Sequence, residues 1–99
     1  MTQELKLISV SFEKDDIGQE IANESEKTLI CDLTSVSMSE RFAAAKSGLN
    51  PEYKAEVSIY DYDGERIAEL YGERYDIYRT YLRENDDTVE LYMQRRAGV

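Results

Sequence analysis

The chain has 99 residues, of which 41% are hydrophobic and 33% are charged, and its formal net charge is −9. This length and balance predict one soluble globular domain over residues 1–99 rather than a disordered chain. No apolar run reaches the roughly 20 residues of a bilayer-spanning helix, and the acidic charge argues against wrapping nucleic acid, which requires a cationic surface.

The first third of the chain predicts two strands. Residues 4–12 are rich in apolar and β-branched side chains, but the apolar phase slips near residues 7–8, which predicts a bulge or a change of sheet. Residues 13–27 are polar and contain Gly18, so we expect a turn and loop there, with a short strand at 19–22 as an alternative. Residues 28–36 alternate again and predict the second strand.

A short helix is predicted over Met38–Ser47. Ser37 and Glu40 form a capping box, in which the serine hydroxyl accepts from the third helical amide and the carboxylate reaches back to the Ser37 amide. Gly48 stands where a helix end requires positive φ, and Pro51 forbids continuation. Isolated helices this short are marginal in water, so this one needs a partner surface or changes conformation when it meets one.

The second half predicts four more strands joined by short connections, at residues 53–62, 66–71, 74–82 and 88–94. Asp63 and Gly64 predict a hairpin between the first two. We therefore expect these four strands to form an antiparallel meander. The predicted fold is mainly β, a small antiparallel six-stranded barrel-like domain with one short helix between strands 2 and 3.

Most of the eight tyrosines lie in this strand-rich half. A barrel this small cannot bury both faces of its strands, so some tyrosines should be exposed. Tyrosine is favoured at protein interfaces, and the alternative is a place in the core or on an edge strand. Arg95 and Arg96 would pair with an acidic neighbouring subunit or form a solvated tail. The candidate subunit-interface residues are Tyr62, Tyr71, Tyr78, Arg79, Arg95 and Arg96.

The sequence shows no catalytic, cofactor or metal motif. It contains no histidine, and its single cysteine, Cys31, alternates with Leu29 and Leu33 as a small buried hydrophobe would. Residues 61–64 match part of a calcium loop, but the first and twelfth ligand positions would be Ile59 and Leu70, which cannot chelate. The 21 carboxylates are expected to form a solvated surface, and nothing selects a catalytic pair among them. We expect no enzymatic activity, cofactor or metal.

Three segments in order resemble the bacteriophage head-closure proteins, which are also called stopper or head–tail joining proteins. They are SVSMSERFAAAKSGLNPEY at 35–53, YGERYDIYRTYL at 71–82 and DDTVELYMQRRAGV at 86–99. The D-x-x-G turn at 15–18, after the first strand, is similar as well. The resemblance covers nearly the whole chain.

The resemblance implies a structural virion protein that forms a ring beneath the portal and its adaptor, retains packaged DNA and presents the tail docking surface. It implies a small β-barrel in which the segment between strands 2 and 3, here about 37–52, projects toward the channel. Implied partners are portal, adaptor and tail proteins and further copies of the chain. Packaged DNA would lie beside the ring without sequence-specific binding, and the implied location is the virion, with the host cytoplasm during assembly. The candidate channel or partner residues are Ser39, Glu40, Phe42, Ala43, Ala44, Ala45, Lys46 and Leu49.

Two alternatives remain open at this point. The first is a tail-completion or tail-terminator ring protein, since these are also small and β-rich. The second is a generic β-barrel module that binds a protein or a small ligand, which predicts a stable monomer with a formed pocket. An enzyme would require a site that the sequence does not show.

Overall fold

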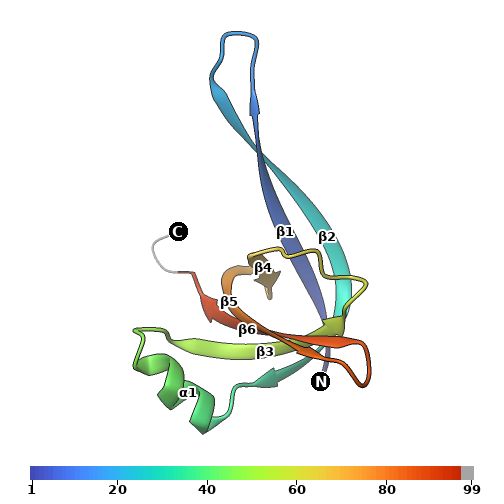
Figure 1. Ribbon diagram of the computed structural model, residues 1–99, viewed down its shortest axis with the longest axis vertical. Coiled ribbons are helices and arrows are strands. Elements are labelled where there is room, and N and C mark those ends of the chain that lie inside the picture. The colour runs from blue at the N-terminus through green and yellow to red at the C-terminus, as the bar shows by residue number, and fades with distance from the viewer. Residues whose placement is uncertain (97–99) are drawn as a thin grey trace.

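The computed structural model describes residues 1–96, which form a closed antiparallel barrel with one helix (Figure 1). This confirms the predicted mainly β fold and the place of the helix between the second and third strands. No helix among the described residues is long and apolar enough to cross a membrane. The elements are β1 (Thr2–Lys14), β2 (Glu20–Ser35), α1 (Met38–Ala45), β3 (Pro51–Ser58), β4 (Ile67–Leu70), β5 (Glu73–Arg83) and β6 (Thr88–Arg95).

The strands follow one another around the barrel in the order β1, β2, β3, β6, β5, β4, and β4 closes the ring against β1. Alternate side chains of each strand point inward, as the period of two requires. Tyr75 is the largest fully buried residue, and its ring packs edge-on to Tyr53 with the centroids 5.8 Å apart. The core consists of Leu5, Leu7, Cys31, Leu33, Ala55, Val57, Ala68, Leu70, Tyr75, Val89, Leu91 and Met93.

The predicted four-strand meander is wrong in one connection. β3 pairs with β2 and β6, while β4 pairs with β1 and β5. Asp63 and Gly64 therefore do not form a hairpin, although Gly64 has the positive φ of +87° expected in a turn. They lie in a longer connection that carries the chain from β3 across to β4. Local turn chemistry could not reveal this, because barrel closure decides which strand stands beside β1.

β1 and β2 form a long hairpin, and this corrects the prediction of a loop at 13–27. Their register runs without interruption from Thr2 opposite Asp32 to Lys14 opposite Glu20, so the bulge predicted near residues 7–8 is absent. The apolar phase changes at Ile8 because both faces of β1 are buried there. Leu7 points into the barrel, and Ile8, on the other face, is also buried.

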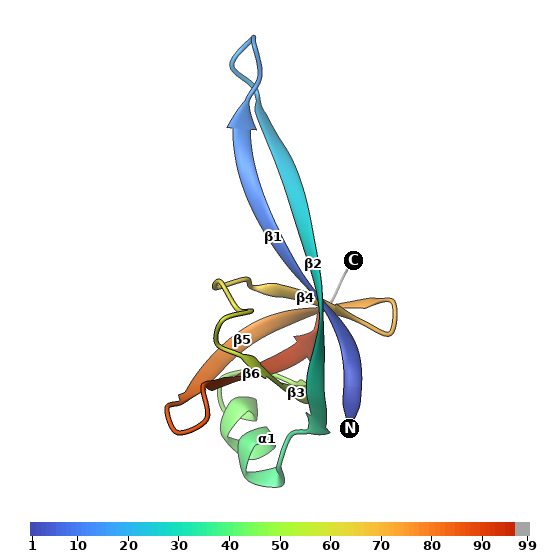
Figure 2. The same cartoon turned by 90° about the vertical axis from the view of Figure 1, so that its right-hand side faces the viewer.

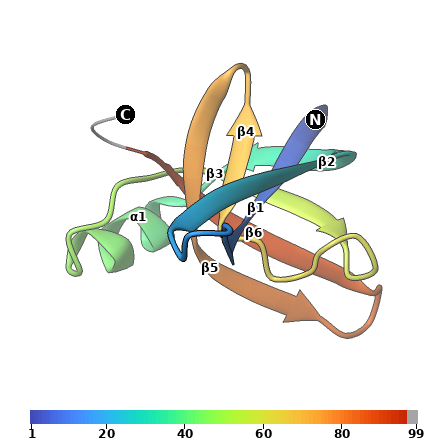
Figure 3. The same cartoon turned by 90° about the horizontal axis from the view of Figure 1, so that it is seen from above.

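The outer part of this hairpin, residues 9–25, is called the arm. β1 pairs with β4 only as far as Ile8, and beyond that point the two arm strands pair with each other (Figure 2). The molecule extends 50 Å along its long axis, with the tip of the arm at one end and α1 near the other (Figures 1 and 2). Seen along this axis, α1 lies to one side of the strands rather than inside the barrel (Figure 3).

Candidate functional site

The first candidate surface is α1 with its flanking turns, whose local sequence explains both ends. The Ser37 hydroxyl accepts from the Glu40 amide at 3.2 Å, as predicted. Two bonds close the other end: the Leu49 amide donates to the Ala44 carbonyl and the Gly48 amide to that of Ala45. This is the pattern of a Schellman motif, with Gly48 at a φ of +77°. The helix ends at Ala45 rather than the predicted Ser47, because this turn takes up the last residues.

Glu40 connects α1 to the barrel, a role that the capping-box prediction missed. Its carboxylate accepts from the Tyr78 hydroxyl at 2.9 Å and from the Arg79 guanidinium at 2.6 Å, rather than from the Ser37 amide. Burial and the hydrogen bond to the Glu40 carboxylate raise the pKa of Tyr78. Arg79 also lies over the Tyr92 ring, 4.0 Å from its centroid. The helix is thus fixed to β5 by one carboxylate.

Tyr78 reaches Glu40 because of an irregularity in β5. The register between β5 and β6 shifts between Ile77 and Arg79, which leaves Tyr78 as an extra residue in the strand. Such a bulge redirects side chains relative to the regular alternation. The tyrosine spacing alone did not predict it, because Tyr75, Tyr78 and Tyr81 also fit an uninterrupted strand.

Most of the predicted channel or partner residues on this segment face solvent. The helix contacts β3, and Ala44 is its buried residue, whereas Glu40 and Leu49 are half-buried. Ser39, Phe42, Ala43, Ala45 and Lys46 are exposed, and 67% of the Phe42 surface is accessible. Met38 at the start of the helix is also exposed. Ala44 is thus the buried residue of the helix, and the large side chains of Met38 and Phe42 remain available.

The predicted interface residues do not gather in one place. Tyr78 and Arg79 adjoin α1, whereas Tyr62 donates its hydroxyl to the Glu65 carbonyl at 2.8 Å in the connection between β3 and β4. Tyr71 is exposed in the turn between β4 and β5. Arg95 pairs with Glu73 at 2.7 Å, and Arg96 pairs with Asp76 at 3.6 Å. In the single chain, Arg95 and Arg96 thus pair with carboxylates of the same molecule.

The second candidate surface is the arm, which sequence reasoning missed as a structural element. Its turn is well specified: Asp15 Oδ1 accepts from the amides of Ile17 and Gln19 at 3.0 and 2.8 Å, and Gly18 has a φ of +85°. The register places Val10, Phe12 and Ala22 on one face of the ribbon. These apolar residues, at alternate positions among polar ones, are the signal in the sequence that could have revealed the arm.

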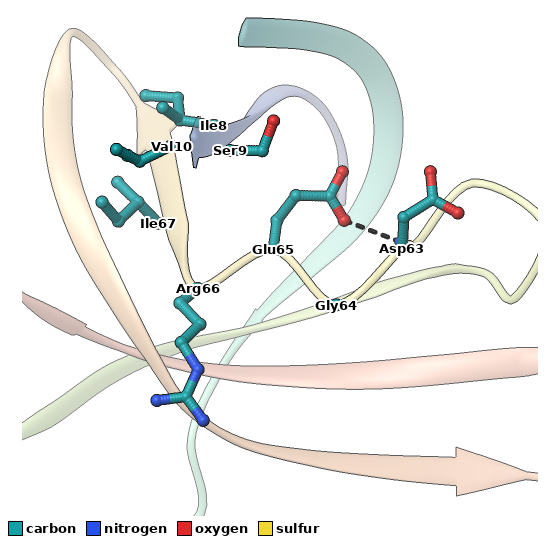
Figure 4. A pocket seen from close by; sticks show the side chains of 8 residues that line it. All are labelled: Ile8, Ser9, Val10, Asp63, Gly64, Glu65, Arg66 and Ile67. Carbon is teal, nitrogen blue, oxygen red and sulfur yellow. Dashed lines mark hydrogen bonds between the residues drawn. The ribbon is translucent and has the colours of Figure 1, made fainter. Parts of the chain in front are cut away.

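A groove of about 460 Å³ lies where the arm leaves the barrel (Figure 4). Ile8, Val10 and Ile67 gather on one side of it, and the Arg66 side chain points away. Opposite them, Glu65 is buried, accepts from the Asp63 amide at 2.7 Å and pairs with Lys27 at 3.1 Å. One side of the groove is apolar, and the carboxylate on the other side is already bonded. The groove therefore suits a docked apolar side chain better than a catalytic reaction.

A network of charges covers the outer face of β3, β5 and β6. Glu56 and Glu90 stand opposite each other, and Arg83 bonds both, at 2.8 and 3.4 Å. Tyr92 donates its hydroxyl to Glu90 at 2.8 Å. These carboxylates are therefore held by donors, as in a structural network. Within residues 1–96, no three potential metal ligands of the Cys, Asp or Glu type lie together as a metal site.

No family model matches the chain, and no curated protein matches it. The functional interpretation consequently depends on the fold, on the two exposed surfaces and on the motifs of the sequence.

Proposed function

We propose that the protein is a structural subunit of a bacteriophage head–tail interface. It would form a ring that closes the DNA-filled head and provides the tail docking surface. The observation that carries the proposal is the closed barrel whose β2–β3 connection is a capped helix with exposed large side chains. This arrangement agrees with the one implied by the resemblance of residues 35–53, 71–82 and 86–99 to head-closure proteins.

The helix has the properties of a segment that changes conformation. It has eight residues, which is too short for stability in isolation, and its anchors to the barrel are the Glu40 carboxylate and the buried Ala44. If those contacts open, the helix loses its support. Because Ser35 and Tyr53 remain paired at its base, residues 37–50 would then form a loop held at both ends. Such a loop would reach about 23 Å from the barrel, half of its extended length at about 3.3 Å per residue. A ring of such segments could cross a DNA channel and close it.

The net charge of −9 suits a subunit beside packaged DNA. An acidic lining repels phosphate, so the DNA passes through the channel without adhering to it. The protein would act in the virion, between portal or adaptor and tail proteins, after assembly in the host cytoplasm. No catalytic step belongs to this function.

The test is removal of the gene from the phage genome that carries it, followed by complementation with the native chain. We expect heads that package DNA, lose it and remain without tails, and complementation should restore filled, tailed particles. Electron microscopy and nuclease protection of the packaged DNA measure both effects. Heads that keep their DNA but lack complete tails would support a tail-completion protein instead. Normal particles without the gene would end the proposal.

A further inference from the structure

Both ends of the molecule carry exposed apolar side chains, which are surrounded by negative charge at the arm and by positive charge at α1. At the arm, Phe12 and Ile17 are 67% and 78% exposed, and Ile21 is also exposed. The arm contains five carboxylates and one lysine, a net charge of −4 over residues 9–25. Its Glu24 is bonded by Arg74, while Glu13, Asp16 and Glu20 are exposed near the tip.

At the other end, α1 exposes Met38 and Phe42 beside two cations, Arg41 and Lys46. Among residues 1–96, neither cation forms an ion pair. The helix's own carboxylate, Glu40, is already bonded by Arg79. A molecule with a net charge of −9 thus presents a locally cationic, apolar surface at this end.

We propose that the arm of one copy docks on α1 of the next copy, with Phe12 and Ile17 against Met38 and Phe42. Asp16 and Glu20 would then face Arg41 and Lys46. This inference deepens the proposed function and rests on it, because it specifies the contact between neighbouring subunits of the ring.

Charge favours contact of the arm with α1 over contact of two arms or of two α1 surfaces. Two arms face to face would bring together two surfaces of charge −4, and two α1 surfaces would oppose two pairs of cations; both contacts are repulsive. The arm and α1 are complementary in charge, and both offer apolar side chains to bury. Because they lie at opposite ends of the 50 Å axis, one molecule cannot satisfy both surfaces by itself.

A contact between two different surfaces of identical subunits is heterologous. It continues from copy to copy and closes into a ring where the rotation permits. A ribbon tip on an eight-residue helix buries less than the roughly 1,600 Å² of a standard stable interface. Each contact is therefore weak alone, and a template that holds the subunits side by side raises their effective concentration.

Reciprocal charge reversal tests the contact. An arm variant carries Asp16→Lys and Glu20→Lys, and a helix variant carries Arg41→Glu and Lys46→Glu; all four positions are exposed. A control with Asp61→Lys and Glu84→Lys changes the net charge as much as the arm variant does, at exposed positions elsewhere. Sedimentation velocity from micromolar to near-millimolar protein measures self-association. Circular dichroism verifies that each variant is folded.

We expect the native chain and the control to associate weakly at high concentration. Each reversed variant alone should associate at least about tenfold more weakly, the effect of about 1.4 kcal/mol. Mixing the two reversed variants should restore association, because the lysines at positions 16 and 20 then face the glutamates at positions 41 and 46. The native arm of the helix variant likewise faces the native α1 of the arm variant. Added salt should weaken the native contact.

Cysteine cross-linking provides a second measurement, since the native Cys31 is buried. A chain with Ile17→Cys and Phe42→Cys should give a ladder of disulfide-linked oligomers under oxidation. Dimers from Ile17→Cys alone, comparable in yield to that ladder, would show an arm-to-arm contact and overturn the proposal. So would a native chain that neither associates nor cross-links at any concentration, or a mixture that fails to restore association. The head-closure proposal is decided separately by DNA retention.

Discussion

Glu40 should contribute a measurable part of the stability, because it is the polar attachment of α1 to the barrel. Its side chain is 16% exposed and accepts from Tyr78 and Arg79. A hydrogen bond to a charged group contributes about 1.5–3 kcal/mol. The Arg79 side chain is 44% exposed, so solvent reduces its share to that of a surface pair, about 0–1 kcal/mol. We therefore expect Glu40→Ala to lower the free energy of unfolding by about 2 kcal/mol.

For a chain of this size, 2 kcal/mol corresponds to a fall in Tm of roughly 8–16 °C. Urea unfolding followed by circular dichroism measures the free energy. The matched control is Ser39→Ala, an exposed change in the same helical turn, which should stay within about 0.5 kcal/mol of the native chain.

A double-mutant cycle with Tyr78→Phe separates the contact from other effects of the substitutions. The coupling energy between positions 40 and 78 should be about 1 kcal/mol. A coupling near zero, with both single variants destabilised, would refute the reasoning. In that case the packing of Ala44, and not the carboxylate, would hold α1 in place.

Three further predictions follow from the same structure. Deletion of residues 39–50 should leave a folded barrel, because it joins Ser35 to its partner Tyr53 through five residues, a length common in β-hairpins. Loss of cooperative unfolding in this variant would instead assign the segment to the core. Phage heads complemented with the deletion variant should lose their DNA. Burial, with the Asp32 carboxylate nearby, raises the pKa of Cys31 from 9.0 to about 11, so the unfolded chain loses the thiol proton first. The free energy of unfolding should thus be unaffected by this group below pH 9 and should fall between pH 9 and about 11, by up to about 1.4 kcal/mol per pH unit. Urea titrations at several pH values should show that Cys31→Ala lacks this fall. If the free energy of the variant fell with pH as steeply as that of the native chain, the assignment to Cys31 would be contradicted. The isolated chain should be a monomer at low micromolar concentration, and a closed ring seen there by light scattering would rule out weak, template-dependent assembly.

Where local chemistry acts alone, the sequence predicted the structure closely. The Ser37 cap, the positive φ of Gly48 and the stop at Pro51 placed α1 to within two residues, because these signals operate within one turn of the chain. The alternation around Cys31 predicted its burial, and the residue is 3% exposed. Strand β6 likewise begins and ends within a residue of its prediction.

The arm was missed for a physical reason. Polar residues in 13–27 resemble a loop because strands are usually recognised by a buried face, and this ribbon has little of the barrel to bury against. Its pairing depends on a turn at Asp15–Gly18 and on uninterrupted register with the barrel strands beneath it. The surface that we propose for docking on the next copy was therefore not among the candidate residues.

The sequence by itself determined the β content, the capped helix, the buried faces of the strands and the absence of histidine chemistry. The tertiary structure decided which strands are neighbours, because closure of a barrel depends on contacts between residues far apart in the chain, such as Ile8 and Ile67. It also decided the role of Glu40, whose partners on β5 are almost forty residues away. Only the folded chain places an acidic arm and a cationic helix at opposite ends of one molecule, since that separation follows from the path of the strands.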